Sequence, residues 1–163
     1  MLAALAARNR LPDLVVSLGS AGSRTLEHAG IYQVASASYR DMDASPLGFA
    51  RGVTPFAGQP ATIPIRHRLA DIPAASLSTG ADIISGSRYD RIDADMVDME
   101  TYAVLRAAQH FGVPMIGLRG ISDGRAALTG LADWTATLGE IDAKLAAVIR
   151  AFADDVKAGR FRL

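Results

Sequence analysis

The chain has 163 residues, half of them hydrophobic, and its 17 basic and 17 acidic residues cancel. This length and apolar content predict one packed domain over residues 1–163 and exclude a disordered chain. A neutral balance without a basic stripe excludes nucleic-acid and anionic-lipid partners, and the lack of cysteine excludes disulfides, thiolate catalysis and Cys-ligated zinc.

Short apolar segments and loops alternate in the first part of the chain. Met1–Asn9 is rich in alanine and leucine and is expected to be helical, ending before Pro12. It is too short to cross a bilayer and lacks the order of a signal peptide, so no membrane partner and a cytoplasmic location are expected. Asp13–Leu18 is predicted to be a buried strand, followed by a loop of small residues at Gly19–Ser23. A second strand is predicted at Ile31–Tyr39.

Five prolines lie within residues 46–73, and they interrupt every helical period there. This stretch is therefore expected to consist of loops with one short strand near Thr62–Arg66. A brief strand at Ala75–Ser78 follows, and it leads into a loop at Thr79–Asp82.

The last third has a clearer pattern. A strand at Ala94–Met99 is predicted to run directly into a helix at Glu100–Phe111. A hydrophobic strand at Pro114–Ile121 and a long helix at Trp134–Lys157 follow. Because strands and helices alternate, we expect a three-layer α/β/α fold with a mixed, mainly parallel central sheet. Ligands of such sheets bind at the carboxyl ends of the strands.

Polar residues follow the predicted strands at four places: Ser20, the loop Gly80–Ile84, the pair Met99–Glu100 and the segment Arg119–Asp123. A carboxylate between a strand and a helix can accept two hydrogen bonds from a sugar diol. A protonated carboxyl group can hand its proton to a leaving base, and an arginine with a hydroxyl can hold a water molecule. Together these residue types suit the cleavage of a glycosidic bond.

Each of these residues also has a purely structural interpretation. Glu100 would suit the positive end of the helix that follows it, and Ser122 and Asp123 could serve as N-caps. The segment Gly19–Gly22 could be an ordinary turn, and it lacks the lysine of a P-loop. Arg119 within a hydrophobic strand must either be paired or open into a cleft.

Metal and cofactor sites are not expected. Asp41 and Asp43 lie two residues apart, but turn or interface roles are favoured over a metal pair. Trp134 opens the last predicted helix, where packing in the core or in a lid is favoured over stacking on a base.

Five segments in order resemble the nucleoside phosphorylase superfamily, most closely its bacterial 5′-methylthioadenosine/S-adenosylhomocysteine nucleosidases. They are Val15–Gly22, Asp41–Ser45, Leu77–Gly80, Val97–Glu100 and Arg119–Asp123. The last two segments are the most specific. The resemblance covers nearly the whole chain, although it is weak between residues 55 and 73. It implies a nucleoside substrate, no cofactor and no metal.

The resemblance implies a role for each matching residue. Asp123 corresponds to the general acid that protonates N7 of adenine, and the backbone near Ser122 and Ile84 to the groups that bind the purine edge. Glu100 matches the glutamate that binds the ribose hydroxyls, and Met99 the residue that packs on the sugar.

The first motif and Arg119 bear on the nucleophile. Ser20 and Arg119 match groups around the attacking water, and Gly22 falls in the segment that contacts the substrate. Phosphorylases of the superfamily have an arginine for phosphate where this chain has Ser17. Because a phosphate dianion without this arginine would be poorly held, water is the expected nucleophile.

Three further positions are carried over from the resemblance. Ile83 stands where the family often has an aromatic residue over the base, which implies aliphatic contact here. Leu47 and Phe49 lie on the segment that crosses a dimer interface in the family and covers the partner's 5′-thio substituent, so a homodimer is expected.

The family normally begins with further strands before the segment matched by Met1–Asn9, and a loop there supplies a glutamate that activates the water. These first strands have no counterpart here, so an uncovered sheet edge is expected. The resemblance implies hydrolysis of adenine nucleosides with a 5′-thio group. The alternatives are a purine nucleoside phosphorylase and a catalytically inactive nucleoside-binding subunit. All three of these functions require that Glu100 and Asp123 lie in the same cleft.

Overall fold

A computed structural model describes residues 1–163. Its six strands are β1 (Val15–Gly22), β2 (Ile31–Tyr39), β3 (Thr62–Pro64), β4 (Ala74–Thr79), β5 (Met96–Asp98) and β6 (Met115–Asp123). The α-helices are α1 (Leu2–Ala6), α2 (Thr101–His110), α3 (Leu131–Thr135) and α4 (Leu138–Lys157). Short 3-10 helices occupy Ser45–Leu47 (η1) and Gly86–Arg91 (η2).

The strands form one mixed sheet in the order β3-β2-β4-β5-β1-β6. The pairs β1–β6, β2–β4 and β4–β5 are parallel, whereas β2–β3 and β1–β5 are antiparallel. The start of β2 also pairs antiparallel with β6, where Ile31 faces Gly120. This extra pairing joins β6, at one end of the strand order, to β2, the second strand from the other end, so the sheet rolls up. On the side of β1 that faces away from β6, β1 pairs with β5 only at Gly22. Most of that edge of β1 therefore has no strand partner.

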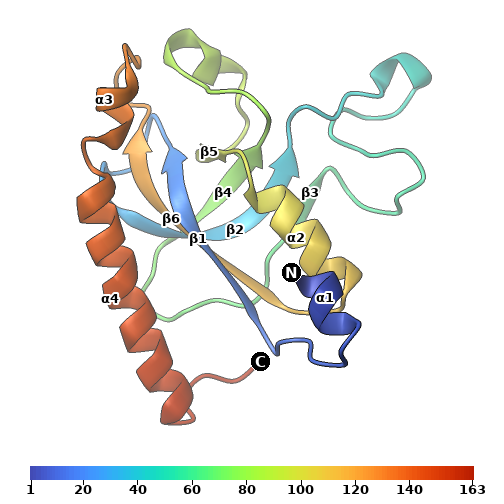
Figure 1. Ribbon diagram of the computed structural model, residues 1–163. Coiled ribbons are helices and arrows are strands. Elements are labelled where there is room, and N and C mark those ends of the chain that lie inside the picture. The colour runs from blue at the N-terminus through green and yellow to red at the C-terminus, as the bar shows by residue number, and fades with distance from the viewer.

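Helices cover both faces of the sheet (Figure 1). The buried side chains of α2, including Leu105, belong to the larger apolar cluster with β2 and β4. Ile141 and Leu145 of α4 pack on Ile116 and Leu118 of β6 in a second cluster. The predicted α/β fold with helices on both faces of a mixed central sheet is therefore confirmed. No helix combines the length and the apolar composition that a bilayer crossing requires.

Two predicted boundaries are wrong. The expected loop Gly19–Ser23 is largely strand, because β1 continues to Gly22 and pairs there with Asp123 of β6. The expected single helix Trp134–Lys157 is divided into α3 and α4. At the break Thr137 has φ −108°, outside the ideal helical value, and its Oγ1 donates to the carbonyl oxygen of Ser122 at 3.3 Å.

Candidate active site

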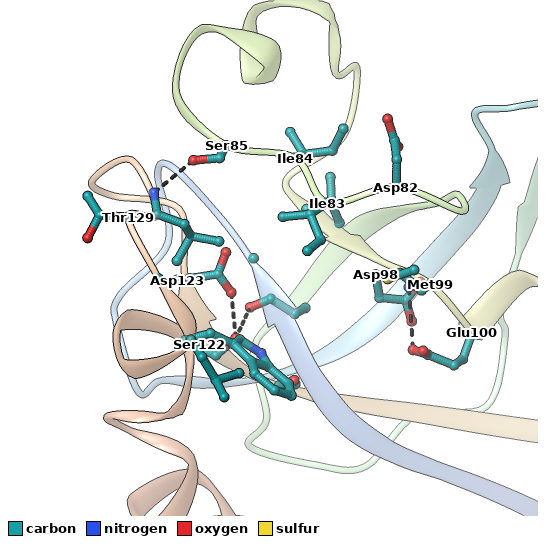
Figure 2. Close-up of a pocket in the computed structure, with 18 of the residues that line it drawn as sticks. Asp82, Ile83, Ile84, Ser85, Asp98, Met99, Glu100, Ser122, Asp123 and Thr129 are labelled. Carbon is teal, nitrogen blue, oxygen red and sulfur yellow. Dashed lines mark hydrogen bonds between the residues drawn. The ribbon is translucent and has the colours of Figure 1, made fainter.

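A cavity of about 660 Å³ opens at the carboxyl ends of β1, β5 and β6, a size common for small-molecule sites. Figure 2 shows the side chains that line it. Eight of the eleven predicted site residues are among them: Ser20, Gly22, Ile83, Ile84, Met99, Glu100, Ser122 and Asp123. Arg119, Leu47 and Phe49 are not. The cavity thus collects groups from distant parts of the chain.

Asp123 ends β6 and faces the cavity (Figure 2). Its Oδ1 accepts a hydrogen bond from the hydroxyl of the fully buried Ser122 at 2.6 Å. The Ser122 carbonyl oxygen is 2.7 Å from Nε2 of His28, so this part of the predicted purine-binding backbone is already engaged. Asp123 therefore presents a carboxyl group that is fixed on one side.

Glu100 stands on the opposite wall of the cavity, after β5 (Figure 2). It precedes α2, but its side chain makes no capping hydrogen bond. The backbone N–H of Thr101 instead donates to Oδ2 of Asp98 at 3.0 Å, so the Asp98 carboxylate accepts a free N–H of the first turn of α2. The Glu100 carboxylate is exposed, and its one hydrogen bond within the chain is a long one, accepted by Oε2 from the N–H of the half-exposed Met99 at 3.4 Å. Because the purely structural role is filled by Asp98, Oε1 of Glu100 is free to bind a ligand.

Ser20 and Gly22 lie near the end of β1 and line the cavity. The Ser20 hydroxyl makes no hydrogen bond within the chain and lines the wall. A Cβ on Gly22 would clash with the hydroxyl of Tyr89 and would lie 2.9 Å from Oδ2 of Asp123. Glycine is therefore required at this position by the close approach of two functional groups.

The loop after β4 forms the upper wall. Ile83 is 64% exposed and points into the cavity, whereas Ile84 is buried against Tyr89 and Val97. Neither the N–H nor the carbonyl oxygen of Ile84 is used in a hydrogen bond within the chain, so both remain available for a purine edge.

Arg40 fastens this loop to the sheet. Its guanidinium donates to the carbonyl oxygens of Ser78 and Asp82, both at 2.6 Å, and to that of Asp98 at 3.1 Å. The Asp82 carboxylate is also paired with Arg88. Burial raises the pKa of Asp82, but the hydrogen bond and charge of Arg88 and the charge of Arg40 outweigh it and lower the pKa overall.

Arg119 lies beneath the cavity, not on its wall. The side chain is buried, and its Nε and Nη2 donate to Oδ2 of Asp98 at 3.1 and 3.0 Å. Further hydrogen bonds reach Thr101 Oγ1 at 2.6 Å and the hydroxyl and carbonyl oxygens of Ser17, both at 3.2 Å. Arg119 was predicted to be one of the groups around the attacking water, but it does not line the cavity and its guanidinium is surrounded by protein acceptors.

The sequence interpretation missed Asp98 as a site residue. Its carboxylate accepts hydrogen bonds from the hydroxyls of Thr79, at 2.6 Å, and Thr101, and is paired with Arg119. All three residues of β5 are buried. An acid that ends a wholly buried strand could have been noticed, because a buried carboxylate needs a partner.

Other residues complete the rim. Ser85 Oγ accepts a hydrogen bond from the N–H of Leu128 at 2.8 Å, which ties the loop after β6 to the loop after β4. Trp134 of α3 lines the cavity and is 40% exposed, so it lies at the rim and not in the core. Asp41 and Asp43 accept backbone hydrogen bonds from Ala81 and Ser45, in line with the turn roles that the sequence favoured.

Leu47 and Phe49 lie on a loop that projects from the sheet after β2 (Figure 1). Leu47 is 76% exposed, and the ring of Phe49 meets that of Phe56 edge to face at 5.7 Å. The structure does not bring these side chains to the cavity of the same chain. Their predicted substrate contact therefore depends on a second copy.

Comparison with known proteins identifies the family. The family model of the phosphorylase superfamily matches residues 1–154. The 5′-methylthioadenosine/S-adenosylhomocysteine nucleosidases of Actinobacillus succinogenes and Hydrogenovibrio crunogenus are 28% identical over 130 residues and 29% identical over 133 residues. Each match covers 69% of this chain and 56% of the relative, so the chain spans just over half the length of these curated relatives.

Solved structures share the fold. The Helicobacter pylori MTAN variant with 5′-methylthioadenosine in its active site has a TM-score of 0.80 at 18% identity. A futalosine hydrolase variant of Helicobacter pylori has a TM-score of 0.79 at 20% identity. Both matches cover 94% of this chain and 73% of the other. The match of the family model over nearly all residues shows that this chain belongs to the phosphorylase superfamily.

Proposed function

We propose that this chain forms the substrate-binding body of a nucleosidase that hydrolyses the bond between adenine and ribose in a nucleoside with a 5′-thio substituent. The observation that carries the proposal is the placement of Glu100 and Asp123 on opposite walls of one cavity. The names of the curated relatives point to the same activity.

Each carboxyl group has one task in this mechanism. Glu100 accepts hydrogen bonds from the two ribose hydroxyls and fixes the sugar. The proton of Asp123 passes to N7 of adenine while the electrons of the bond between C1′ and N9 move to the base. A water molecule then forms the new bond to C1′ and loses a proton to the solvent, so that free adenine and the ribose with its 5′-thio substituent leave. Placement of the sugar between the two groups supplies much of the rate.

Water is favoured over phosphate as the nucleophile, because no basic side chain on the cavity wall is free to bind an anion. Arg40 is the one basic side chain on its wall, and its donors are directed to carbonyl oxygens and to Asp82. Ser17 stands where phosphorylases have an arginine, and its hydroxyl accepts from Arg119. A dianion would therefore lose its hydration without gaining a partner.

The assay follows adenine release from 5′-methylthioadenosine with and without phosphate. Release of free 5-methylthioribose in both conditions is the expected result, and strict dependence on phosphate would show a phosphorylase instead. Binding without adenine release would favour an inactive nucleoside-binding subunit. Because a futalosine hydrolase shares the fold, futalosine and S-adenosylhomocysteine belong in the same panel, and the preferred 5′ group identifies the substrate.

We also propose that the protein is a homodimer with the loop of Leu47 and Phe49 at the interface. Phe56, which contacts Phe49, is 96% exposed, so this loop presents apolar side chains to solvent. Sedimentation equilibrium tests the proposal: replacing Leu47 and Phe56 by serine should give monomers, whereas Val156→Ser, on the half-exposed end of α4, should not. A monomeric parent chain would contradict it.

A further inference from the structure

Tyr89 holds a buried hydroxyl for which the structure provides no partner. The residue lies in η2, is 6% exposed, and packs its ring with Ile84 and Val97 behind the cavity wall. Its hydroxyl is the one buried side-chain polar atom in the chain without a hydrogen bond. An unpaired buried hydroxyl is unfavourable, so its surroundings need an explanation.

The Tyr89 hydroxyl lies near the carboxyl group of Asp123. A Cβ placed on Gly22 would clash with the Tyr89 oxygen and lie 2.9 Å from Oδ2 of Asp123. A Cβ on Gly124 would lie 2.6 Å from the same Tyr89 oxygen, and Gly124 has a φ of +111°. Two glycines thus make room for the phenol, and the Tyr89 oxygen and Oδ2 of Asp123 both lie close to the position that a methyl group on Gly22 would occupy.

The two groups have complementary hydrogen-bonding capacity. Burial and then the negative charge of Asp123 raise the pKa of Tyr89 well above its usual range, against the opposite effect of Arg40 and Arg24, so Tyr89 keeps its proton and remains a donor. Oδ1 of Asp123 accepts from Ser122, whereas Oδ2 accepts from no group of the chain. A free acceptor and a free donor therefore lie close to the same point beside Gly22.

We infer that Tyr89 is a positioning residue for Asp123: once the carboxyl group is ionised, the Tyr89 hydroxyl, which has no hydrogen-bond partner in the structure, donates to Oδ2. The inference deepens the proposed function, on which it rests for the role of Asp123 as proton donor. When the carboxyl proton has passed to N7, Ser122 supports Oδ1 and Tyr89 supports Oδ2 of the carboxylate that remains. Tyr89 keeps its own proton throughout.

This second donor has a chemical consequence. Hydrogen bonds to the charged form of a carboxyl group stabilise it, so the Asp123 carboxylate that remains after proton transfer is stabilised by two donors. The bond also prevents rotation of the carboxyl group away from the purine, since both oxygens are held. The other charged groups that act on the Tyr89 hydroxyl are Arg24, which also lies over its ring, and Arg40, and both stay in place in the variants below. Asp82, Asp98 and Glu100 line the same cavity and are likewise unchanged.

The test measures the titration of Asp123 itself. The chain is labelled with ¹³C at aspartate carboxyl groups, and the signal of Asp123 is assigned by its loss in Asp123→Asn. In Tyr89→Phe the apparent pKa of Asp123 should rise by about one unit, as expected for the loss of one hydrogen bond to a charged group. The ring and its packing remain in this variant.

Tyr102→Phe is the matched control. Tyr102 is a buried tyrosine on α2 that stacks on Tyr39 at 5.5 Å and does not line the cavity. An unchanged titration of Asp123 in Tyr89→Phe, or the same shift in both variants, would overturn the inference. The measurement needs no turnover, so a chain that releases no adenine would refute the proposed function and leave this result intact.

Discussion

Arg119 and Asp98 form a buried ion pair in which two guanidinium nitrogens approach Oδ2 of the carboxylate at 3.0 and 3.1 Å. The pair links β6 to the end of β5 beneath the cavity, one residue before Met99 and two before Glu100. Since Asp98 also accepts from Thr101, the start of α2 and the ion pair are held together. Arg119 therefore acts on the site by fixing the backbone that carries Glu100.

Arg119→Met should lower the free energy of unfolding by about 3–5 kcal/mol, because it leaves the Asp98 carboxylate buried without its partner. Urea unfolding measures this loss. Ser17→Ala, which removes one hydrogen-bond acceptor from the same arginine, should cost only about 1 kcal/mol. The double variant Asp98→Asn with Arg119→Met should be more stable than Arg119→Met alone, and an equal or greater loss would contradict the pairing.

Asp123→Asn should reduce adenine release by about 10²- to 10⁴-fold, since the asparagine has no acidic proton for the leaving base. The far-ultraviolet circular dichroism and the melting temperature should stay close to those of the parent chain. Asp142→Asn on the exposed side of α4 is the matched control and should leave the rate unchanged. Near-full activity of Asp123→Asn would show that another group supplies the proton.

Gly22→Ala should lower adenine release by more than about tenfold and destabilise the chain by about 1–3 kcal/mol, because the new methyl group meets Tyr89 and Asp123. Gly19→Ala in the same strand is the control. A Cβ there finds its nearest neighbour, the Arg119 side chain, at an ordinary contact distance of 3.6 Å. Steady-state kinetics and thermal unfolding compare the two, and equal effects would mean that the crowding at Gly22 is unimportant.

Ile83→Phe should lower KM for 5′-methylthioadenosine about three- to tenfold, because an aromatic ring at this exposed cavity position can stack on the base. Ile83→Leu keeps an aliphatic side chain of the same size and should leave KM nearly unchanged. Initial-rate kinetics distinguish the two. A KM that rises in Ile83→Phe would indicate that the base does not lie against this residue.

Removing the charge of Arg88 should make the loop after β4 less sensitive to acid. The pKa of Asp82 is lowered in the folded chain, so its pairing stabilises the loop above the usual pKa of 3.8 and is lost as the pH falls below that value. Thermal unfolding from pH 6 to pH 3 should therefore show a smaller fall in melting temperature for Arg88→Met than for the parent chain. Because both side chains are about half exposed, the difference will be small.

Local pattern was sufficient for most strands, for α2 and for the clustering of Glu100 with Asp123. Apolar runs between glycine and proline identify strands, and polar residues just after parallel strands meet at one edge of a sheet. The end of β1 was misassigned because Gly19–Gly22 has the small residues of a turn, while the register with β6 extends it as a strand.

The sequence by itself determined the α/β class, the family and eight side chains of the cavity, since these depend on the order of elements and on motifs within short segments. Only the tertiary structure decided that Arg119 pairs with Asp98 below the cavity and that the Tyr89 hydroxyl lies near Asp123. The same holds for the pairing of β2 with β6, which rolls the sheet. The direction of a buried polar side chain follows from the acceptors that packing brings within reach, and those come from residues far away in the chain.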